Sequence, residues 1–329
     1  MDEHTNLTLK TEKIDSDLTI CTVSYESLDY LRLNVKLIRI MNPDTSYCYQ
    51  VVENSMPDSH KRVYPDIGDI EIMQGPTHKK RLYGSASYHH GEGLNLCISN
   101  IKTRFLLVLD PDFYIVMHNW IRKVVSYMQE ENIAILGVPW HPYRYRKWRY
   151  FPAVHCTFFD LSKVSKDILD FRPDYETYPP VKKRFSAIRK RLKRFDPLKM
   201  HRRKYINCSA DTGFRIYKRC YNDHSIKTEC FTPVYKPPVS ARLREVLFPD
   251  RISLLPKQAG YYSKTCFADY GLPDFQGLGC EEFLWNGQPF GFHVRAFPKS
   301  KHNRHSSISA VLYETEKLIV NRNNDTDPA

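Results

Sequence analysis

Apolar and polar positions along the first 140 residues follow two different periodicities. Short runs of strand length, rich in apolar and β-branched side chains, occupy residues 18–23, 47–52, 70–73, 105–109 and 133–138. Between them, apolar residues recur at helical spacing in 28–41 and 119–130, and the polar stretch 84–100 predicts a helix started by its glycines. Strands that alternate with helices predict an α/β fold with a mostly parallel central sheet flanked by helices.

The apolar run Phe105–Leu109 leads directly into Asp110-Pro111-Asp112. It predicts a strand buried on both faces, although a helix fragment has the same pattern. Because Pro111 has no amide proton and favours an extended residue before it, the strand should end at Asp110. Asp110 and Asp112 then lie side by side at the sheet edge where α/β proteins bind ligands. The two carboxylates either hold Mg²⁺ or Mn²⁺ or close the strand as a simple turn.

Composition indicates a globular protein of ordinary solubility. The chain has 329 residues, of which 42% are hydrophobic and 26% charged. No apolar run approaches the roughly 20 residues that cross a bilayer, and the first residues are polar and acidic. The nine cysteines are scattered without any Cys-x-x-Cys spacing, which argues against a zinc ribbon or a disulfide scaffold. We therefore expect a cytoplasmic protein with reduced thiols.

Most of the net charge of +12 lies in one segment. Residues 181–204 hold twelve Lys or Arg against Asp196 alone, and so carry +11 of the total. An apolar stripe at helical spacing runs through the segment: Val181, Phe185, Ile188, Leu192 and Phe195. Such a helix lies on an anionic membrane, packs with a solvated basic face, or binds nucleic acid. The candidate membrane contacts are Lys182, Lys183, Arg184, Arg189, Lys190, Arg191, Lys193 and Arg194.

Four segments, in this order, resemble the inverting family 2 glycosyltransferases of the GT-A fold, of the type that builds bacterial surface polysaccharides. They are Thr19–Glu26, Val51–Ser55, His90–Asn95 and Leu109–Asp112. The resemblance implies a nucleotide-diphosphate-sugar donor, a divalent metal (Mn²⁺ or Mg²⁺) on Asp110 and Asp112, and inversion at the anomeric carbon. By position it implies donor contacts at Thr22, Ser24, Tyr25, Glu26, Glu53, Asn54, Asn95 and Asp110.

An inverting enzyme also needs a base that takes the proton of the acceptor hydroxyl. The family places an acidic residue at a helix start, and Asp211 in Ser209–Arg215 is the candidate, with a helix cap as the alternative role. Glu281 and Glu282, expected at another helix start, are the alternative bases. His293, on an aromatic strand, either completes the metal site, as the resemblance implies, or is a hydrogen-bonded core residue.

Aromatic and basic residues are concentrated in 139–152, which either stack on an acceptor sugar or pack beneath an insertion. The candidate acceptor contacts are Trp140, His141, Tyr143 and Trp148. The predicted organisation is a nucleotide-sugar-binding half (17–140), an irregular acceptor-side half (141–310) with a basic amphipathic helix near 181–204, and peripheral tails (1–16 and 311–329).

The predicted function is metal-dependent transfer of a hexosyl-type sugar to a hydroxyl of a glycan or lipid-linked acceptor. The basic segment would then hold the enzyme on the inner face of the cytoplasmic membrane. Two other classes compete with this prediction. A nucleic-acid-binding protein would use the basic segment, but the nearly neutral remainder of the chain does not favour it. A nucleotidyltransferase also pairs carboxylates at a strand end, but usually adds a third carboxylate.

Overall fold

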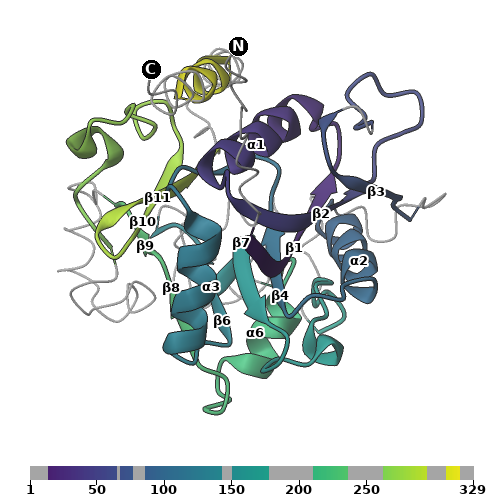
Figure 1. Ribbon diagram of the computed structural model, residues 1–329. Coiled ribbons are helices and arrows are strands. Elements are labelled where there is room, and N and C mark those ends of the chain that lie inside the picture. Colours follow the sequence, from purple (N-terminus) through teal and green to yellow (C-terminus); the bar gives the residue numbers. More distant parts are fainter. Residues whose placement is uncertain are drawn as a thin grey trace, which may run out of the picture.

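The computed structural model describes residues 14–64, 67–76, 86–142, 150–177, 210–235, 262–294 and 309–318. Its central sheet has seven strands in the order β3-β2-β1-β4-β7-β6-β8 (Figure 1). These strands are β1 (Ile14–Ser24), β2 (Thr45–Glu53), β3 (Glu71–Gln74), β4 (Phe105–Leu109), β6 (Ile135–Pro139), β7 (Pro152–Asp160) and β8 (Thr228–Cys230). All neighbours pair in parallel except β7, which is antiparallel to β4 and to β6. The predicted α/β class with a mostly parallel central sheet is confirmed.

A second, antiparallel sheet of four strands lies beside the first, at the left of Figure 1. Its order is β5 (Phe113–Ile115), β11 (Gln288–His293), β10 (Glu281–Trp285) and β9 (Thr232–Pro233). Strand β5 follows β4 after a tight turn and pairs with β11, which in turn pairs with β10. Both β11 and β10 therefore lie near the carboxyl end of β4. The second sheet thus brings residues near position 290 against residues near position 110.

Helices cover both faces of the central sheet. They are α1 (Leu28–Met41), α2 (Ala86–Ser99), α3 (Trp120–Glu130) and α6 (Phe214–Cys220). In β4, Phe105, Leu107 and Leu109 pack into the core with α1, α3 and the second sheet, whereas Leu106 and Val108 pack into the core with α2 and α6. All five side chains are at most 1% exposed, so β4 is a strand buried on both faces, as predicted.

Helix α2 contains two glycines of the predicted segment 84–100 in its interior, while Gly84 lies outside the described residues. It includes Ala86, so Gly91 and Gly93 lie within the helix. A Cβ at Gly91 would come within 2.7 Å of the Phe171 carbonyl oxygen, and one at Gly93 within 2.9 Å of Val23. The glycines therefore serve the close approach of α2 to β1 and to the segment after β7.

Each of the two sheets contains strands from both predicted halves of the chain. Strands β7 and β8 from the second half lie in the central sheet, and β5 from the first half lies in the second sheet. A helix at residues 309–318 buries Val311, Thr315 and Leu318, so this part of the expected tail packs on the core. No helix among the described residues is long and apolar enough to span a membrane.

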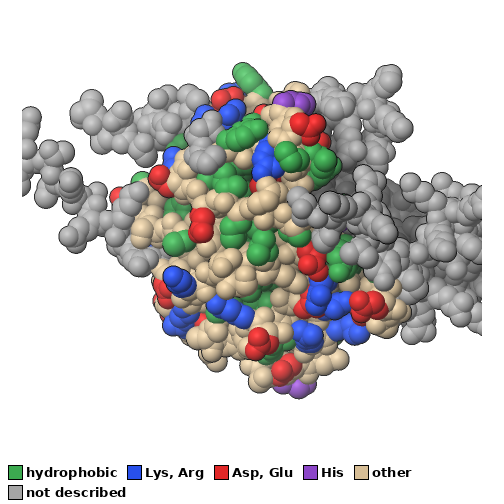
Figure 2. Space-filling model, turned by 90° about the vertical axis from the view of Figure 1, so that its right-hand side faces the viewer, with side chains coloured by type: hydrophobic (Ala, Val, Ile, Leu, Met, Phe, Trp, Pro, Cys, Tyr) green, Lys and Arg blue, Asp and Glu red, His purple; other side chains and the backbone are tan. Residues whose placement is uncertain are grey.

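The surface of the described residues carries charges of both signs. On the face shown in Figure 2, Lys and Arg side chains lie among Asp and Glu side chains. This mixture agrees with the sequence, in which the excess positive charge falls within 181–204. That basic segment and its eight candidate membrane contacts lie outside the described residues.

Candidate functional site

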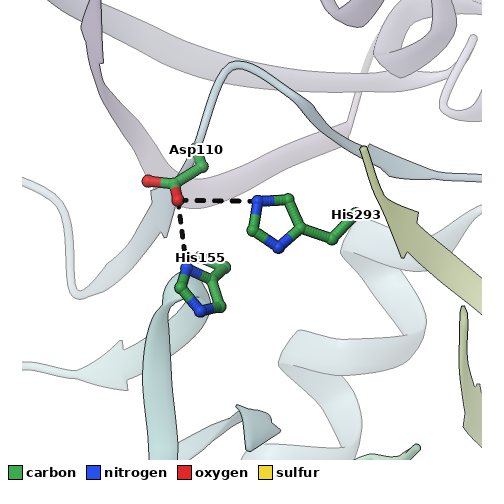
Figure 3. Close-up of side chains that lie close together, drawn as sticks. All are labelled: Asp110, His155 and His293. Carbon is green, nitrogen blue, oxygen red and sulfur yellow. Dashed lines mark hydrogen bonds and ion pairs between the residues drawn. The ribbon is translucent and has the colours of Figure 1, made fainter. Parts of the chain in front are cut away.

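The side chain of Asp110, at the end of β4, is approached by histidines from two other strands (Figure 3). Its Oδ2 lies 3.1 Å from Nδ1 of His155 in β7 and 3.9 Å from Nε2 of His293 in β11. The same nitrogen of His293 lies 3.2 Å from Oδ1 of Asp112. The histidine side chains are 2% (His155) and 1% (His293) exposed, while the side chains of Asp110 and Asp112 are 13% and 31% exposed. The cluster is therefore buried on the histidine side and open on the carboxylate side.

Strand pairing explains why these residues meet. In the antiparallel pair β4–β7, Leu109 faces Cys156, and the Asp110 amide donates to the His155 carbonyl at 2.9 Å. In the second sheet His293 faces Phe113, and the Val294 amide donates to the Asp112 carbonyl at 2.9 Å. Each histidine is thus placed by backbone hydrogen bonds next to one of the two aspartates.

Two further side chains, those of His90 and Glu281, lie next to the cluster of Asp110, Asp112, His155 and His293. Nε2 of His90, in α2, lies 3.4 Å from the other carboxylate oxygen of Asp110. Oε2 of Glu281, in β10, lies 3.5 Å from Nδ1 of His293. Glu281 is fully buried and faces His293 in the β10–β11 register. Three imidazoles therefore converge on Asp110, with a buried carboxylate behind one of them.

The donor set fits a divalent metal ion. One ligand atom each from Asp110, His155 and His293 lie within 4.8 Å of one another. A carboxylate oxygen and imidazole nitrogens are ordinary ligands of Mn²⁺, Co²⁺ and Zn²⁺. Burial, together with the neighbouring Asp110 carboxylate, raises the pKa of the Cys156 thiol well above its usual value, so the thiol stays protonated at neutral pH. The ligands at hand are thus carboxylates and imidazoles.

Several residues predicted to contact the donor have side chains that are hydrogen-bonded inside the protein. These hydrogen bonds connect β1, β2 and α2 to neighbouring segments. Thr22 donates to the Leu109 carbonyl, the Ser24 hydroxyl bonds that of Ser27, Glu53 accepts from the Ser55 and Val63 amides, and the Asn95 amide group bonds Asp170 and Phe171. The physical reason is burial, since Thr22, Ser24 and Glu53 are fully buried.

The remaining predicted donor contacts lie in the loops after β1 and β2. Tyr25 is 60% exposed, and Glu26 is exposed in the left-handed region with φ +51°. The Glu26 amide donates to the Ser55 hydroxyl at 2.7 Å, which ties the two loops together. Asn54 is partly buried and its amide group donates to the His89 carbonyl at 3.1 Å. Tyr25 and Glu26 are therefore the predicted donor contacts most open to a ligand.

Asp211 lies in the turn before α6 and not in the helix itself. The N-cap position is Gly213, with φ +77°, so the alternative role of Asp211 as the helix cap is wrong. Oδ1 of Asp211 accepts from the Thr212 amide at 2.9 Å. The Thr212 hydroxyl donates to the Ser87 carbonyl, three positions before His90 in α2. This contact places the turn against the first turns of the helix that carries His90.

Glu281 and Glu282 are strand residues, which corrects the prediction that they start a helix. Both side chains are fully buried. Glu282 accepts from the Phe267 amide at 2.9 Å and from the Gln276 amide at 3.1 Å. Sequence patterns missed this arrangement because an acidic pair normally stays at the surface. Neither carboxylate is presented to an acceptor hydroxyl.

Two predicted acceptor contacts pack in the interior, which corrects their proposed role. Trp140 is 3% exposed and meets the His155 ring edge-on, with centroids 4.3 Å apart. His141 is fully buried, with Nε2 2.8 Å from the Val234 carbonyl oxygen. The packing alternative therefore holds for both residues. Tyr143 and Trp148 lie outside the described residues.

His155 and His90 were absent from the predicted site. His155 lies in the run 151–159, where one imidazole interrupts mostly apolar residues, and that interruption was the available indication. His90 belongs to a segment singled out by its resemblance, but only Asn95 of that segment was assigned a contact. Both histidines become candidates only when β7 and α2 are placed beside β4.

The solved structures that resemble this chain include TarS and two structures of LgtC, all at low TM-scores. Neither family models nor curated proteins match the chain. A structure of TarS from S. aureus matches with 17% identity and a TM-score of 0.35, over 48% of this chain and 30% of that one. An active-site mutant of LgtC matches with 10% identity and a TM-score of 0.32, over 64% and 72% of the two chains. The galactosyltransferase LgtC with donor and acceptor sugar analogues matches with 11% identity and a TM-score of 0.30, over 74% and 98%.

The match to TarS spans less than a third of the length of that chain. At TM-scores between 0.30 and 0.35 a shared fold does not follow. The functional assignment therefore has to come from the chemistry of the site.

Proposed function

We propose that this protein is a metal-dependent glycosyltransferase of the GT-A fold, which moves a hexosyl-type sugar from a nucleotide-diphosphate donor to a hydroxyl of a glycan or lipid-linked acceptor. One observation carries the proposal. His293 approaches both aspartates of the Asp-Pro-Asp sequence, 3.9 Å from Asp110 and 3.2 Å from Asp112, although 181 positions separate His293 from Asp112. The resemblance of the sequence to family 2 also implies that these three residues form one metal site.

The charge of the leaving group explains why such a site is needed. Breaking the bond between sugar and diphosphate leaves negative charge on the diphosphate, which a divalent ion held by Asp110, Asp112 and His293 would stabilise. Asp110 and Asp112 are partly exposed, so oxygens of a ligand can approach from the open side of the cluster. The buried histidines exclude water from the opposite side.

The nucleotide would lie over the carboxyl ends of β1 and β2. This edge of an open α/β sheet is the usual ligand site. There Tyr25 and Glu26 are exposed, and the Glu53 carboxylate holds the loop after β2 through the Ser55 and Val63 amides. We assign base or ribose contacts to Tyr25 and Glu26, and to Glu53 the positioning of the loop.

Asp211 is the proposed base that takes the proton of the acceptor hydroxyl. Its side chain is partly buried, unlike those of Glu281 and Glu282. The turn that carries it packs between α2, which bears His90, and β7, since a Cβ on Gly213 would lie 2.7 Å from Val154. Inversion at the anomeric carbon requires the acceptor to attack opposite the leaving diphosphate, with the base beside it.

The basic segment 181–204 is proposed to hold the enzyme on the inner face of an anionic membrane, where a lipid-linked acceptor is available. The support is its charge of +11 and the apolar stripe at helical spacing. Flotation with anionic and neutral liposomes tests this part. Binding that requires anionic lipid and weakens with salt supports it, whereas binding to neither kind of liposome contradicts it.

A thermal-shift panel of nucleoside diphosphates with and without Mn²⁺ tests the proposed enzyme class. We expect one nucleotide to raise the melting temperature only when the metal is present, because the diphosphate is bound through it. Asp110→Asn and Asp112→Asn should abolish the shift. Asp69→Asn is the matched control, because Asp69 is an exposed surface carboxylate paired with Arg39. If no nucleotide stabilises the parent protein, the proposed function is wrong.

A further inference from the structure

Three imidazoles lie around the Asp110 carboxylate, whereas one would be enough to hydrogen-bond it. His155 and His293 approach one oxygen of Asp110 at 3.1 and 3.9 Å, and His90 approaches the other at 3.4 Å. They come from β7, β11 and α2. The proposed function needs only the two aspartates and His293, so His155 is an additional potential ligand.

We propose that Asp110, His155 and His293 bind a transition-metal ion of the Mn²⁺, Co²⁺ or Zn²⁺ class before any nucleotide binds, and that the site discriminates against Mg²⁺. The inference deepens the proposed function and rests on it for the later role of the ion. Imidazole nitrogen is a good ligand for these transition metals. Mg²⁺ prefers oxygen ligands in a near-octahedral arrangement and keeps several of its waters. Two buried imidazoles therefore favour the transition metals.

The separation of the ligand atoms matches a common ion. Atoms bound to one ion at about 2.0–2.2 Å lie roughly 3–4 Å apart. The Asp110 oxygen lies 3.1 Å from the His155 nitrogen and 3.9 Å from the His293 nitrogen. With all three atoms within 4.8 Å of one another, the protein alone supplies three ligands. An ion held by three protein ligands does not need the diphosphate in order to bind.

Packing fixes both imidazoles in advance. The His155 ring meets Trp140 edge-on at 4.3 Å and lies 4.5 Å from the His293 ring, with 32° between the ring planes. The His293 ring also contacts Phe113, with centroids 5.9 Å apart. Because the rings are confined on several sides, metal binding costs little additional side-chain entropy.

Glu281 contacts the His293 ring on the side that faces away from the two aspartates. Its Oε2 lies 3.5 Å from Nδ1 of His293, while Nε2 of the same ring faces Asp110 and Asp112. A carboxylate behind a metal-binding histidine fixes its tautomer and raises its basicity as a ligand. This arrangement leaves Nε2 of His293 as the nitrogen presented to the ion.

Direct metal binding to the full chain tests the inference without a nucleotide or an assay of activity. The protein, stripped with a chelator, is titrated with MnCl₂ while free Mn²⁺ is followed by electron paramagnetic resonance. We expect one site, no displacement by a hundredfold excess of MgCl₂, and displacement by CoCl₂ or ZnCl₂. His155→Ala should weaken Mn²⁺ binding at least tenfold, whereas His224→Ala, at an exposed histidine, should bind as the parent does.

His155→Gln guards against an effect of misfolding, because it keeps a polar side chain in the same strand. A variant that melts near the parent temperature but binds Mn²⁺ weakly supports the inference. The inference is wrong if the parent binds no Mn²⁺, if MgCl₂ displaces it, or if both His155 variants bind as the parent does. Metal binding without stabilisation by any nucleoside diphosphate would instead contradict only the proposed function, and nucleotide binding that Mg²⁺ supports as well as Mn²⁺ would contradict only this inference.

Discussion

Glu281 lies directly behind His293, with Oε2 3.5 Å from Nδ1 of the imidazole. The two residues face each other across β10 and β11, and both are at most 1% exposed. The opposite nitrogen of the same ring faces Asp112 at 3.2 Å. A line of carboxylate, imidazole and carboxylate therefore runs from the interior to the open side of the cluster.

Replacing Glu281 by Gln should lower the affinity for Mn²⁺ by roughly 10–100-fold, because the amide supports His293 less well as a ligand. Glu282→Gln is the matched control on the same strand. Glu282 accepts from the Phe267 and Gln276 amides, so its replacement should lower the melting temperature and leave metal affinity unchanged. Titration with Mn²⁺ and thermal melts of both variants check this prediction. Equal metal affinity in Glu281→Gln and the parent would show that Glu281 does not position His293.

Asp211→Asn should lower turnover by roughly 10²–10⁴-fold while leaving binding of the donor nucleotide intact, because only proton removal is lost. The exposed residue Asp223 supplies the control variant, Asp223→Asn, which should keep the parent rate. Steady-state rates and nucleotide binding are measured in parallel. An unchanged rate in Asp211→Asn would exclude it as the base.

Asp160→Asn should destabilise the fold by about 2–4 kcal/mol at neutral pH, because Asp160 accepts two hydrogen bonds from Arg104 and its side chain is fully buried. Burial opposes ionisation, but hydrogen bonds from Arg104 and Ser162 outweigh it and lower the pKa of Asp160 to about 2. A lowered pKa stabilises the folded state above the unfolded value near 3.8, and that stabilisation is lost as the pH falls toward about 2. Urea unfolding at pH 7 and pH 3 should therefore show a smaller difference between parent and variant at pH 3. A difference independent of pH would contradict this origin.

Gly91→Ala should destabilise the protein by about 1–3 kcal/mol, since the new methyl group would meet the Phe171 carbonyl oxygen at 2.7 Å. Ser99→Ala, at the exposed end of the same helix, should change stability by much less. Chemical unfolding of both variants checks the prediction. A Gly91→Ala variant as stable as the parent would mean that α2 moves away from the segment after β7 without cost.

Local sequence patterns predicted β1, β2, β3, β4 and β6 of the central sheet, because each of these strands is a short apolar run in the sequence. The apolar run of β4 and the Asp-Pro-Asp sequence after it marked Asp110 and Asp112 as candidate metal ligands, whereas His293 was assigned to the same site only through the resemblance to family 2. Asp110 and Asp112 are marked by neighbours a few positions away in the sequence. His293 lies 3.9 Å from Asp110 and 3.2 Å from Asp112, and its role as a metal ligand stays a proposal.

The remainder of the site depends on pairings between distant segments. The sequence did not predict His155 as a site residue, because β7 lies antiparallel between β4 and β6. No local sequence pattern predicts that β7 pairs with β4. Glu281 was placed at a helix start because buried carboxylates are rare and an acidic pair usually marks a surface. The resemblance implies ligand contacts at Thr22 and Glu53, whereas in the structure their side chains are hydrogen-bonded to Leu109, Ser55 and Val63.

The most direct test of the proposed function is the release of nucleoside diphosphate from a panel of nucleotide sugars in the presence of Mn²⁺. We expect at least one donor to be turned over, with the rate falling roughly 10²–10³-fold in Asp112→Asn, because the negative charge on the diphosphate is then less well stabilised. Asp69→Asn, at an exposed surface carboxylate, should keep the parent rate. Turnover that is unchanged in Asp112→Asn, or the absence of turnover of every donor by protein that binds Mn²⁺, would contradict a sugar-transfer site at this cluster.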